Sequence, residues 1–101
     1  MPESPPRLSA KESVILALLA ERGEMYGLEL VNASDGRLKR GTVYVTLGRM
    51  DDKGYLESRQ EEPTVGAIGL PRRLYRPTAF GLRVRDAWEI AKERLAFEGS
   101  R

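Results

Sequence analysis

Basic side chains are concentrated in two segments of this 101-residue chain. Residues 36–50 include four Lys or Arg residues and no acid, and residues 71–85 include five and no acid. The intervening residues 51–62 have five acids and two bases. Because the net charge is only +2, the distribution of charge carries more information than the total. Two basic segments around an acidic one favour binding of a polyanion, and an ordinary solvated surface is the alternative.

Hydrogen-bonding side chains recur along one side of a helix predicted at about residues 41–53. Val43, Leu47 and Met50 are spaced i, i+4 and i+7, which predicts the buried stripe of this helix. A second, mostly polar stripe at i, i+3, i+4 and i+7 consists of Thr42, Val45, Thr46 and Arg49. Such donors and acceptors on an exposed helix face can read base edges in the DNA major groove, where a valine can meet a thymine methyl.

Other side chains near this helix could hold phosphates. Lys39 and Arg40 precede the helix with no acid nearby, and amide groups at helix N-termini attract anions. Tyr44 lies on the flank of the polar stripe and is either a DNA contact or a partly buried core residue. Arg49 either contacts a base or pairs with an acid on its own helix.

Two strands with alternating apolar and polar residues are predicted at residues 55–60 and 72–78. Residues 61–71 between them are rich in Gly and Pro, which suits an extended hairpin tip. Arg72 and Arg73 begin the second strand, where they can reach a phosphate or the minor groove. A solvated hairpin is the alternative for both arginines.

The residue types that are absent exclude most enzymatic functions. The chain has no His and no Cys, which excludes Cys/His metal sites, Ser-His-Asp triads and disulfides. The sequence GAIG at residues 66–69 lacks the flanking strand, helix and lysine of a phosphate-binding loop. We therefore expect no enzyme, no metal site and no cofactor. The sequence shows no secretion signal or membrane-spanning run, so we expect a cytoplasmic protein.

Two short helices precede the polar one. The first begins at Ser9, which has Glu12 at capping-box spacing, and ends at Gly23. The second covers residues 26–33, and its Gly27 permits close contact with the first helix. Three helices with short connections and a following hairpin predict an α+β, mostly helical fold, a winged helix-turn-helix with a two-stranded wing.

A last helix is predicted from Ala79, with Thr78 as its cap, to about Phe97. Its apolar residues are spaced four, three and four apart, as in the seam of a short coiled coil. They are Val84, Trp88, Ala91 and Leu95. A second copy of the chain would cover this seam, which predicts a homodimer. Trp88 belongs either to the dimer core or to a platform for a flat ligand.

The predicted elements divide the chain into three parts. Residues 1–7 form a flexible N-terminal arm, residues 8–78 a winged-helix DNA-binding domain and residues 79–101 a C-terminal dimerisation helix. A winged helix that binds an acidic protein partner, and no DNA, is the alternative function.

Four segments resemble the signature segments of the PadR family of bacterial transcriptional regulators. They are LSAKESVILALLA, MYGLEL, GTVYVTLGRMDDKGYLES and RRLYRPTAFG, and together they span about residues 8–81. The resemblance implies a homodimeric, sequence-specific regulator that binds double-stranded operator DNA, usually as a repressor. It also implies release by a small aromatic ligand. We expect the operator to be an inverted repeat, to match the twofold symmetry of a dimer.

Overall fold

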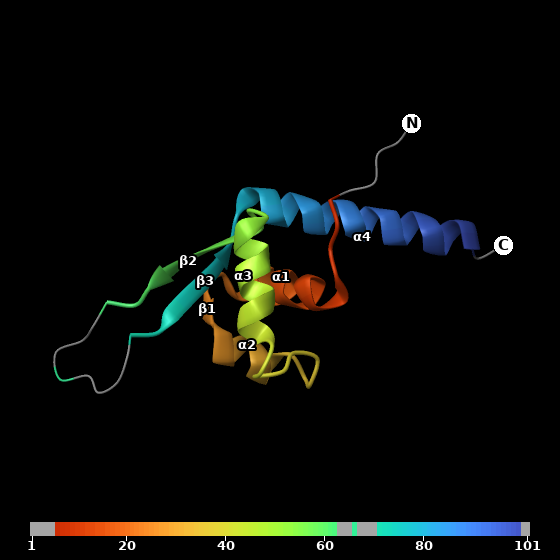
Figure 1. Cartoon of the computed structure of the whole chain (residues 1–101). Helices are drawn as coiled ribbons and strands as arrows, with labels where there is room; N and C mark the ends of the chain where they lie inside the picture. Colours follow the sequence, from red (N-terminus) through yellow and green to blue (C-terminus); the bar gives the residue numbers. More distant parts are fainter. Residues whose placement is uncertain (1–5, 63–65, 67–70, 100–101) are drawn as a thin grey trace.

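The computed structural model describes residues 6–62, 66 and 71–99, which form four helices and a small antiparallel sheet. The elements follow in the order α1 (Ala10–Arg22), β1 (Met25–Tyr26), α2 (Gly27–Ala33), α3 (Val43–Asp52), β2 (Leu56–Gln60), β3 (Arg73–Pro77) and α4 (Ala79–Gly99). Figure 1 shows α3 in front of α1, the β2–β3 hairpin extending to one side, and α4 running along the opposite edge past the other helices. The predicted winged helix-turn-helix fold is confirmed.

Helix α1 begins at the predicted capping box. Ser9 Oγ accepts a hydrogen bond from the Glu12 amide at 3.2 Å, and Glu12 Oε1 accepts one from the Ser9 amide at 2.9 Å. The helix ends at Gly23, whose φ is 87°. Its fully buried apolar side chains are Ile15, Leu16 and Leu19.

Helix α2 starts one residue later than predicted, and Tyr26 precedes it. The Tyr26 amide donates to Glu29 Oε1 at 2.8 Å. A Cβ on Gly27 would lie 2.6 Å from Cε1 and 2.8 Å from Cζ of Tyr44. The expected contact of Gly27 with the first helix is therefore wrong: the absent side chain makes room for the α3 tyrosine, which crosses the start of α2.

The turn between α2 and α3 is held by one buried serine. Ser34 Oγ donates to the Val31 carbonyl at 2.8 Å and accepts from the Leu38 amide at 2.9 Å. Leu38 itself is buried, so this turn anchors the residues that precede α3. The predicted buried stripe of α3 is confirmed, and it consists of Val43, Leu47 and Met50.

The sheet has the strand order β1-β3-β2, with both pairs antiparallel. The predicted hairpin is present, with Leu56 opposite Pro77 and Gln60 opposite Arg73. The two-residue strand β1 adds a third strand that the sequence analysis missed, because two residues are too few to show an alternating pattern. Most of the predicted hairpin tip at residues 61–71 lies outside the described residues.

Helix α4 is tied to the end of α3 through its cap. Thr78 Oγ1 accepts from the Gly81 amide at 2.9 Å, as predicted, and donates to the Gly54 carbonyl at 2.6 Å. The first half of α4 packs against α1, and its second half runs beyond the other helices (Figure 1).

Two hydrogen bonds hold the segment before α1. Trp88 Nε1 donates to the Pro6 carbonyl at 2.8 Å, and Tyr55 Oη donates to the Arg7 carbonyl at 2.7 Å. Pro6 and Arg7 belong to the arm that was predicted to be flexible over residues 1–7. The backbone of these two residues is therefore anchored to the folded domain, and residues 1–5 lie outside the described residues.

Candidate nucleic-acid interface

The mostly polar stripe of α3 lies on the face beside its buried stripe. Val45 and Tyr44 are 58% and 52% exposed, values that are high for apolar and aromatic side chains in a small domain. Thr42 and Arg49 are also exposed, and Thr46 is partly exposed. The Thr46 hydroxyl lies 3.4 Å from the Thr42 carbonyl, a long contact that leaves it free to accept another hydrogen bond.

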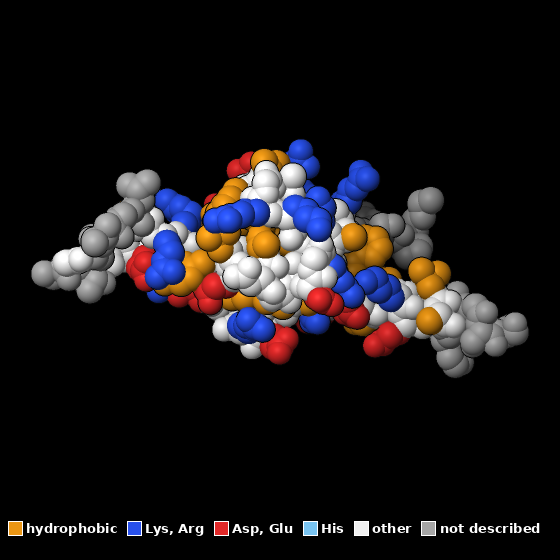
Figure 2. Space-filling model, turned by 90° about the horizontal axis from the view of Figure 1, so that it is seen from below, with side chains coloured by type: hydrophobic (Ala, Val, Ile, Leu, Met, Phe, Trp, Pro, Cys, Tyr) orange, Lys and Arg blue, Asp and Glu red, His pale blue; other side chains and the backbone are white. Residues whose placement is uncertain are grey.

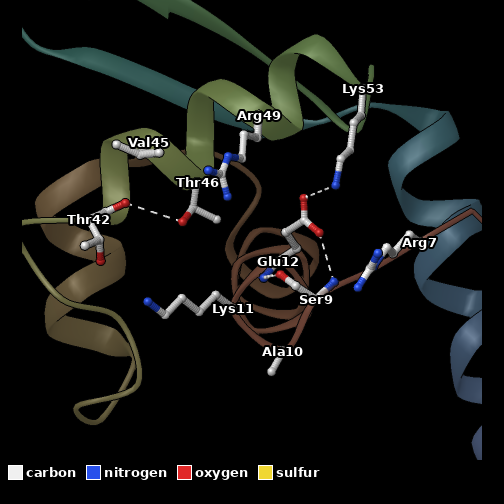
Figure 3. Close-up of a pocket in the computed structure, with 10 residues that line it drawn as sticks. All are labelled: Arg7, Ser9, Ala10, Lys11, Glu12, Thr42, Val45, Thr46, Arg49 and Lys53. Atoms are coloured by element: carbon white, nitrogen blue, oxygen red, sulfur yellow. Dashed lines mark hydrogen bonds and ion pairs between the residues drawn. The ribbon is translucent and has the colours of Figure 1, made fainter.

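Two grooves flank α3. The first, of about 740 Å³, lies between α3 and the segment that leads into α1, and we call it the α1 groove (Figure 3). Its α3 wall includes Thr42, Val45, Thr46 and Arg49. The second, of about 460 Å³, lies between Tyr44, the start of α2 and the beginning of β3, and we call it the wing groove. Most of the predicted base-reading stripe therefore faces the α1 groove, and Tyr44 faces the wing groove.

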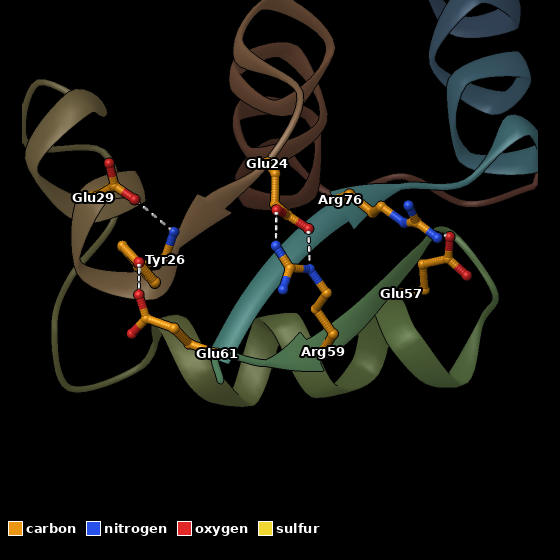
Figure 4. Close-up of polar contacts among 7 residues, drawn as sticks. All are labelled: Glu24, Tyr26, Glu29, Glu57, Arg59, Glu61 and Arg76. Atoms are coloured by element: carbon orange, nitrogen blue, oxygen red, sulfur yellow. Dashed lines mark hydrogen bonds and ion pairs between the residues drawn. The ribbon is translucent and has the colours of Figure 1, made fainter. Parts of the chain in front are cut away.

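Arg72, one of the two predicted wing contacts, is engaged within the chain. Its guanidinium carbon lies 4.1 Å from the centre of the Tyr26 ring, and its Nε lies 3.4 Å from Glu61 Oε2. Tyr26 Oη donates to Glu61 Oε1 at 2.6 Å (Figure 4). This hydrogen bond raises the pKa of Tyr26 and lowers the pKa of Glu61. Arg73 differs, since among the described residues its guanidinium donates only to the Ser58 hydroxyl, at 3.1 Å.

The other arginines at the base of the wing are also paired with acids. Arg59 donates two hydrogen bonds to Glu24, at 3.0 and 2.8 Å, and these lower the pKa of the Glu24 carboxyl. Arg76 donates to Glu57 at 2.7 Å (Figure 4). The acidic segment 51–62 therefore neutralises part of the second basic segment, and the wing offers less positive charge than the sequence suggests.

The first basic segment keeps its charge. Lys39, Arg40 and Arg49 are exposed, and within the described part of the chain none of them forms an ion pair. The alternative in which Arg49 pairs with an acid on its own helix is therefore not observed among these residues. Figure 2 shows Lys and Arg side chains predominating along the upper part of this face, with Asp and Glu mixed among them lower down.

An ion pair between an exposed lysine and a buried glutamate lines the α1 groove. Lys53 Nζ lies 2.7 Å from Glu12 Oε2, and Glu12 is only 3% exposed (Figure 3). Burial by itself raises the pKa of Glu12, but the hydrogen bonds from Lys53 and Ser9 outweigh it, so the pKa lies below its ordinary value. The pair joins the start of α1 to the end of α3, and both of its residues line the groove.

Replacing Lys53 with methionine is expected to lower the free energy of unfolding by about 1–2 kcal/mol near neutral pH, because Glu12 then stays buried without its charged partner. Since the folded-state pKa of Glu12 is lowered, its contribution is complete above the ordinary pKa of 4.5 and is lost as the pH falls through the folded-state pKa. The difference between wild type and variant should therefore shrink in acid, which urea denaturation at several pH values measures.

Lys92→Met is the matched control, because its amine lies 4.0 Å from an exposed glutamate, Glu89. This change is expected to alter stability by less than about 0.5 kcal/mol. Equal losses of stability in the Lys53 and Lys92 variants would show that the Glu12–Lys53 pair contributes no more than an exposed pair.

The four residues of the predicted dimer seam are buried to different degrees along α4. Val84 is buried within the chain, and Trp88 packs partly buried against the same core. Ala91 is partly buried, whereas Leu95 is 69% exposed. Val84 is thus satisfied within one chain, Trp88 keeps part of its surface exposed, and Leu95 has the most apolar surface left to bury against another chain.

The sequence analysis missed the contribution of α1 to this region. Arg7 and Lys11 line the α1 groove, yet neither was a candidate, because no local pattern shows that the start of α1 lies beside α3. Arg7 precedes the cap of α1 and Lys11 lies in its first turn, so no helical spacing links the two residues in the sequence. In the described part of the chain no cluster of acids could hold a metal ion, and none of the helices is long and apolar enough to cross a bilayer.

The sequence matches the model of the transcriptional regulator PadR-like family over residues 15–87. No curated protein matches the chain. Among solved structures, a PadR family transcriptional regulator from Eggerthella lenta is 30% identical, with a TM-score of 0.68, and the match covers 86% of this chain and 74% of that one.

Two further structures share the fold. A PadR family transcription regulator from Clostridium difficile is 29% identical, with a TM-score of 0.65, and the match covers 90% of this chain and 92% of that one. Bacillus subtilis PadR, solved in complex with operator DNA, is 22% identical, with a TM-score of 0.70. That match covers 83% of this chain and 49% of PadR.

Proposed function

This chain belongs to the PadR-like family of transcriptional regulators, and from that premise we propose that it binds operator DNA with α3 in the major groove and represses transcription. Members of this family are transcriptional regulators, not enzymes. The observation that carries the proposal is the stripe of Thr42, Thr46 and Arg49, which is wholly or partly exposed on a helix whose apolar stripe is buried. Such a helix can enter a groove without disturbing the core behind it.

The surroundings of α3 support the same placement. Lys39 and Arg40 lie just before the helix with uncompensated charge, where they can hold a phosphate while α3 reads the bases. Tyr44 and Arg73 flank the wing groove and can contact the backbone on that side. Because Arg72 is already paired with Glu61, we assign it a smaller part in DNA binding than Arg73. The similar fold of a PadR solved with operator DNA supports this orientation.

A homodimer joined through α4 completes the proposal. The second half of the helix runs beyond the rest of the chain and leaves Leu95 exposed on the same face as Trp88, so a second copy can cover it (Figure 1). A dimer would place two copies of α3 on an inverted repeat, with half-sites one helical turn or a multiple apart.

A small aromatic effector at this seam would have to use the part of Trp88 that the chain leaves exposed. A regulator of this kind acts where the chromosome is, in the cytoplasm.

Replacing Leu95 with glutamate is expected to weaken the dimer at least tenfold, because the charge must then be desolvated at the seam. The fold should be unaffected, since the side chain is exposed in the single chain. Ile90→Glu is the matched control, because Ile90 is 55% exposed but lies on another face of α4. Sedimentation equilibrium measures both variants. A larger effect for Ile90 than for Leu95 would place the interface on the other face.

Binding of duplex DNA tests the function as a whole. Fluorescence anisotropy with a random-sequence duplex at low salt should show binding that weakens steeply as salt is added, because counterions are released from phosphates. Selection of bound fragments from the genome of the source organism should then yield an inverted repeat. No binding to random duplex and no enriched fragment would refute the proposal and favour a winged helix that binds an acidic protein.

A further inference from the structure

We propose that the α1 groove is a second contact with the DNA backbone, in which Arg7 and Lys11 bind phosphates on the side of α3 opposite the wing. This inference rests on the proposed function and adds to it a part of the chain outside the recognition helix and the wing. The partner chemistry is the phosphodiester backbone of double-stranded DNA.

The first argument is the composition of the groove. Arg7 and Lys11 lie on its α1 side and Arg49 lies across from them on α3 (Figure 3). All three side chains are exposed, and among the described residues none of them forms an ion pair. The one acid of the groove, Glu12, is neutralised by Lys53 at 2.7 Å. The groove therefore presents uncompensated positive charge over about 740 Å³.

The second argument is the anchoring of the segment that carries Arg7. The Arg7 carbonyl accepts from Tyr55 Oη at 2.7 Å, and the neighbouring Pro6 carbonyl accepts from Trp88 Nε1 at 2.8 Å. These bonds span 48 and 82 residues of sequence, so they fix the segment to distant parts of the fold. An ordered backbone lowers the entropy cost when the Arg7 side chain binds an anion.

The N-terminus of α1 is not assigned as the anion site. The capping box already occupies two of its amides, since Ser9 Oγ accepts from the Glu12 amide and Glu12 accepts from the Ser9 amide. The proposed phosphate contact rests on the side chains of Arg7 and Lys11.

The third argument is the geometry of a helix in the major groove. The groove is about 12 Å wide and an α-helix with its side chains is about 10–12 Å across, so phosphates border the helix on both sides. On the wing side, Arg72, Arg59 and Arg76 are paired with acids. Arg73 is left to contact the strand on the wing side. Arg7 and Lys11 add positive charge on the opposite side of α3, next to the second strand.

Replacing both Arg7 and Lys11 with alanine tests the inference. Removing one phosphate-binding side chain makes the slope of log K against log salt shallower by about 0.9. The double variant should therefore have a slope shallower by about 1.8 for each bound protomer, or about 3.6 for a dimer bound to both half-sites. Binding to operator and to random duplex should weaken by the same factor, because phosphates carry no sequence information. Arg22→Ala with Arg83→Ala is the control, since these exposed arginines line neither groove and remove the same charge.

An unchanged slope in the Arg7 and Lys11 variant, with wild-type protein binding normally, would overturn the inference and leave the proposed function intact. Equal reductions in the test and control variants would also overturn it, because they would show only an effect of net charge. Absence of binding by the wild type would instead refute the proposed function, and this inference with it.

Tyr55→Phe tests the anchoring separately, because it removes the hydroxyl that holds the Arg7 carbonyl and keeps the ring. We expect a weaker affinity and a shallower salt slope in the wild-type background, and no further change when Arg7 is already alanine. The Arg7→Lys variant should retain the wild-type slope. If Tyr55→Phe weakens binding equally in both backgrounds, the hydroxyl has a general structural role and does not act by positioning Arg7.

Discussion

Replacing Gly81 with alanine is expected to destabilise the fold by about 3 kcal/mol, the upper end of the usual range for an overpacked site. A Cβ at this position would lie 2.8 Å from the carbonyl carbon and 3.0 Å from the Cα of Tyr55. These are backbone atoms, so no side-chain rotation can relieve the clash. The Tyr55 carbonyl also accepts from the Thr78 amide at 3.1 Å, so moving it would disturb the start of α4.

Thermal unfolding followed by circular dichroism measures this destabilisation. For a domain of this size, about 3 kcal/mol corresponds to a fall in Tm of roughly 10–20 °C. Gly48→Ala is the matched control, because Gly48 lies in α3 and a Cβ there would meet nothing within 4 Å. That variant should be neutral or more stable by about 0.5–1 kcal/mol, as expected for alanine in a helix. A Gly81 variant as stable as the Gly48 variant would mean that α4 can shift away from Tyr55 at little cost.

Replacing Arg49 or Thr46 with alanine is expected to reduce discrimination between operator and random DNA, because each side chain would no longer bond to a base edge. The expected reduction is about 1–3 kcal/mol for each base that the protein no longer reads, roughly 5- to 150-fold. Both side chains lie on the exposed face of α3, and Arg49 has no ion pair to give up among the described residues. The stability of either variant should remain near that of the wild type, because neither side chain is in the core.

The contrast with Lys39 and Arg40 makes this prediction specific. Replacing both with alanine should weaken binding to every duplex by a similar factor and make its salt dependence shallower, as expected for side chains that bind phosphates. Competition titrations with operator and random duplex at two salt concentrations separate the two classes. If the Arg49 and Thr46 variants keep full discrimination, α3 is not the element that reads the sequence.

Local signals in the sequence account for most of the fold. The capping box at Ser9, the cap at Thr78 and the buried stripe of α3 were all predicted correctly. Each depends on residues three to seven positions apart, so the pattern is visible without knowledge of the tertiary structure. The exposed stripe of α3 could be identified for the same reason, since it is the neighbouring face of the same helix.

The charges of the candidate interface could not be predicted in this way. Arg59 pairs with Glu24 across 35 residues, and Lys53 pairs with Glu12 across 41. Such partners depend on how the elements pack, and no local spacing indicates them. The sequence therefore predicted more unpaired positive charge on the wing than the structure shows. It also gave no sign of the groove beside α1.

The helices, their caps and the exposed face of α3 can be read from the chain alone, because they follow from backbone hydrogen bonding and the periodicity of apolar residues. The folded structure was needed to show which cations lack an acidic partner among the described residues, that Tyr44 needs the space at Gly27 and how the chain before α1 is held. Charge pairing and close packing act through space between residues far apart in the chain, and only folding brings those residues together.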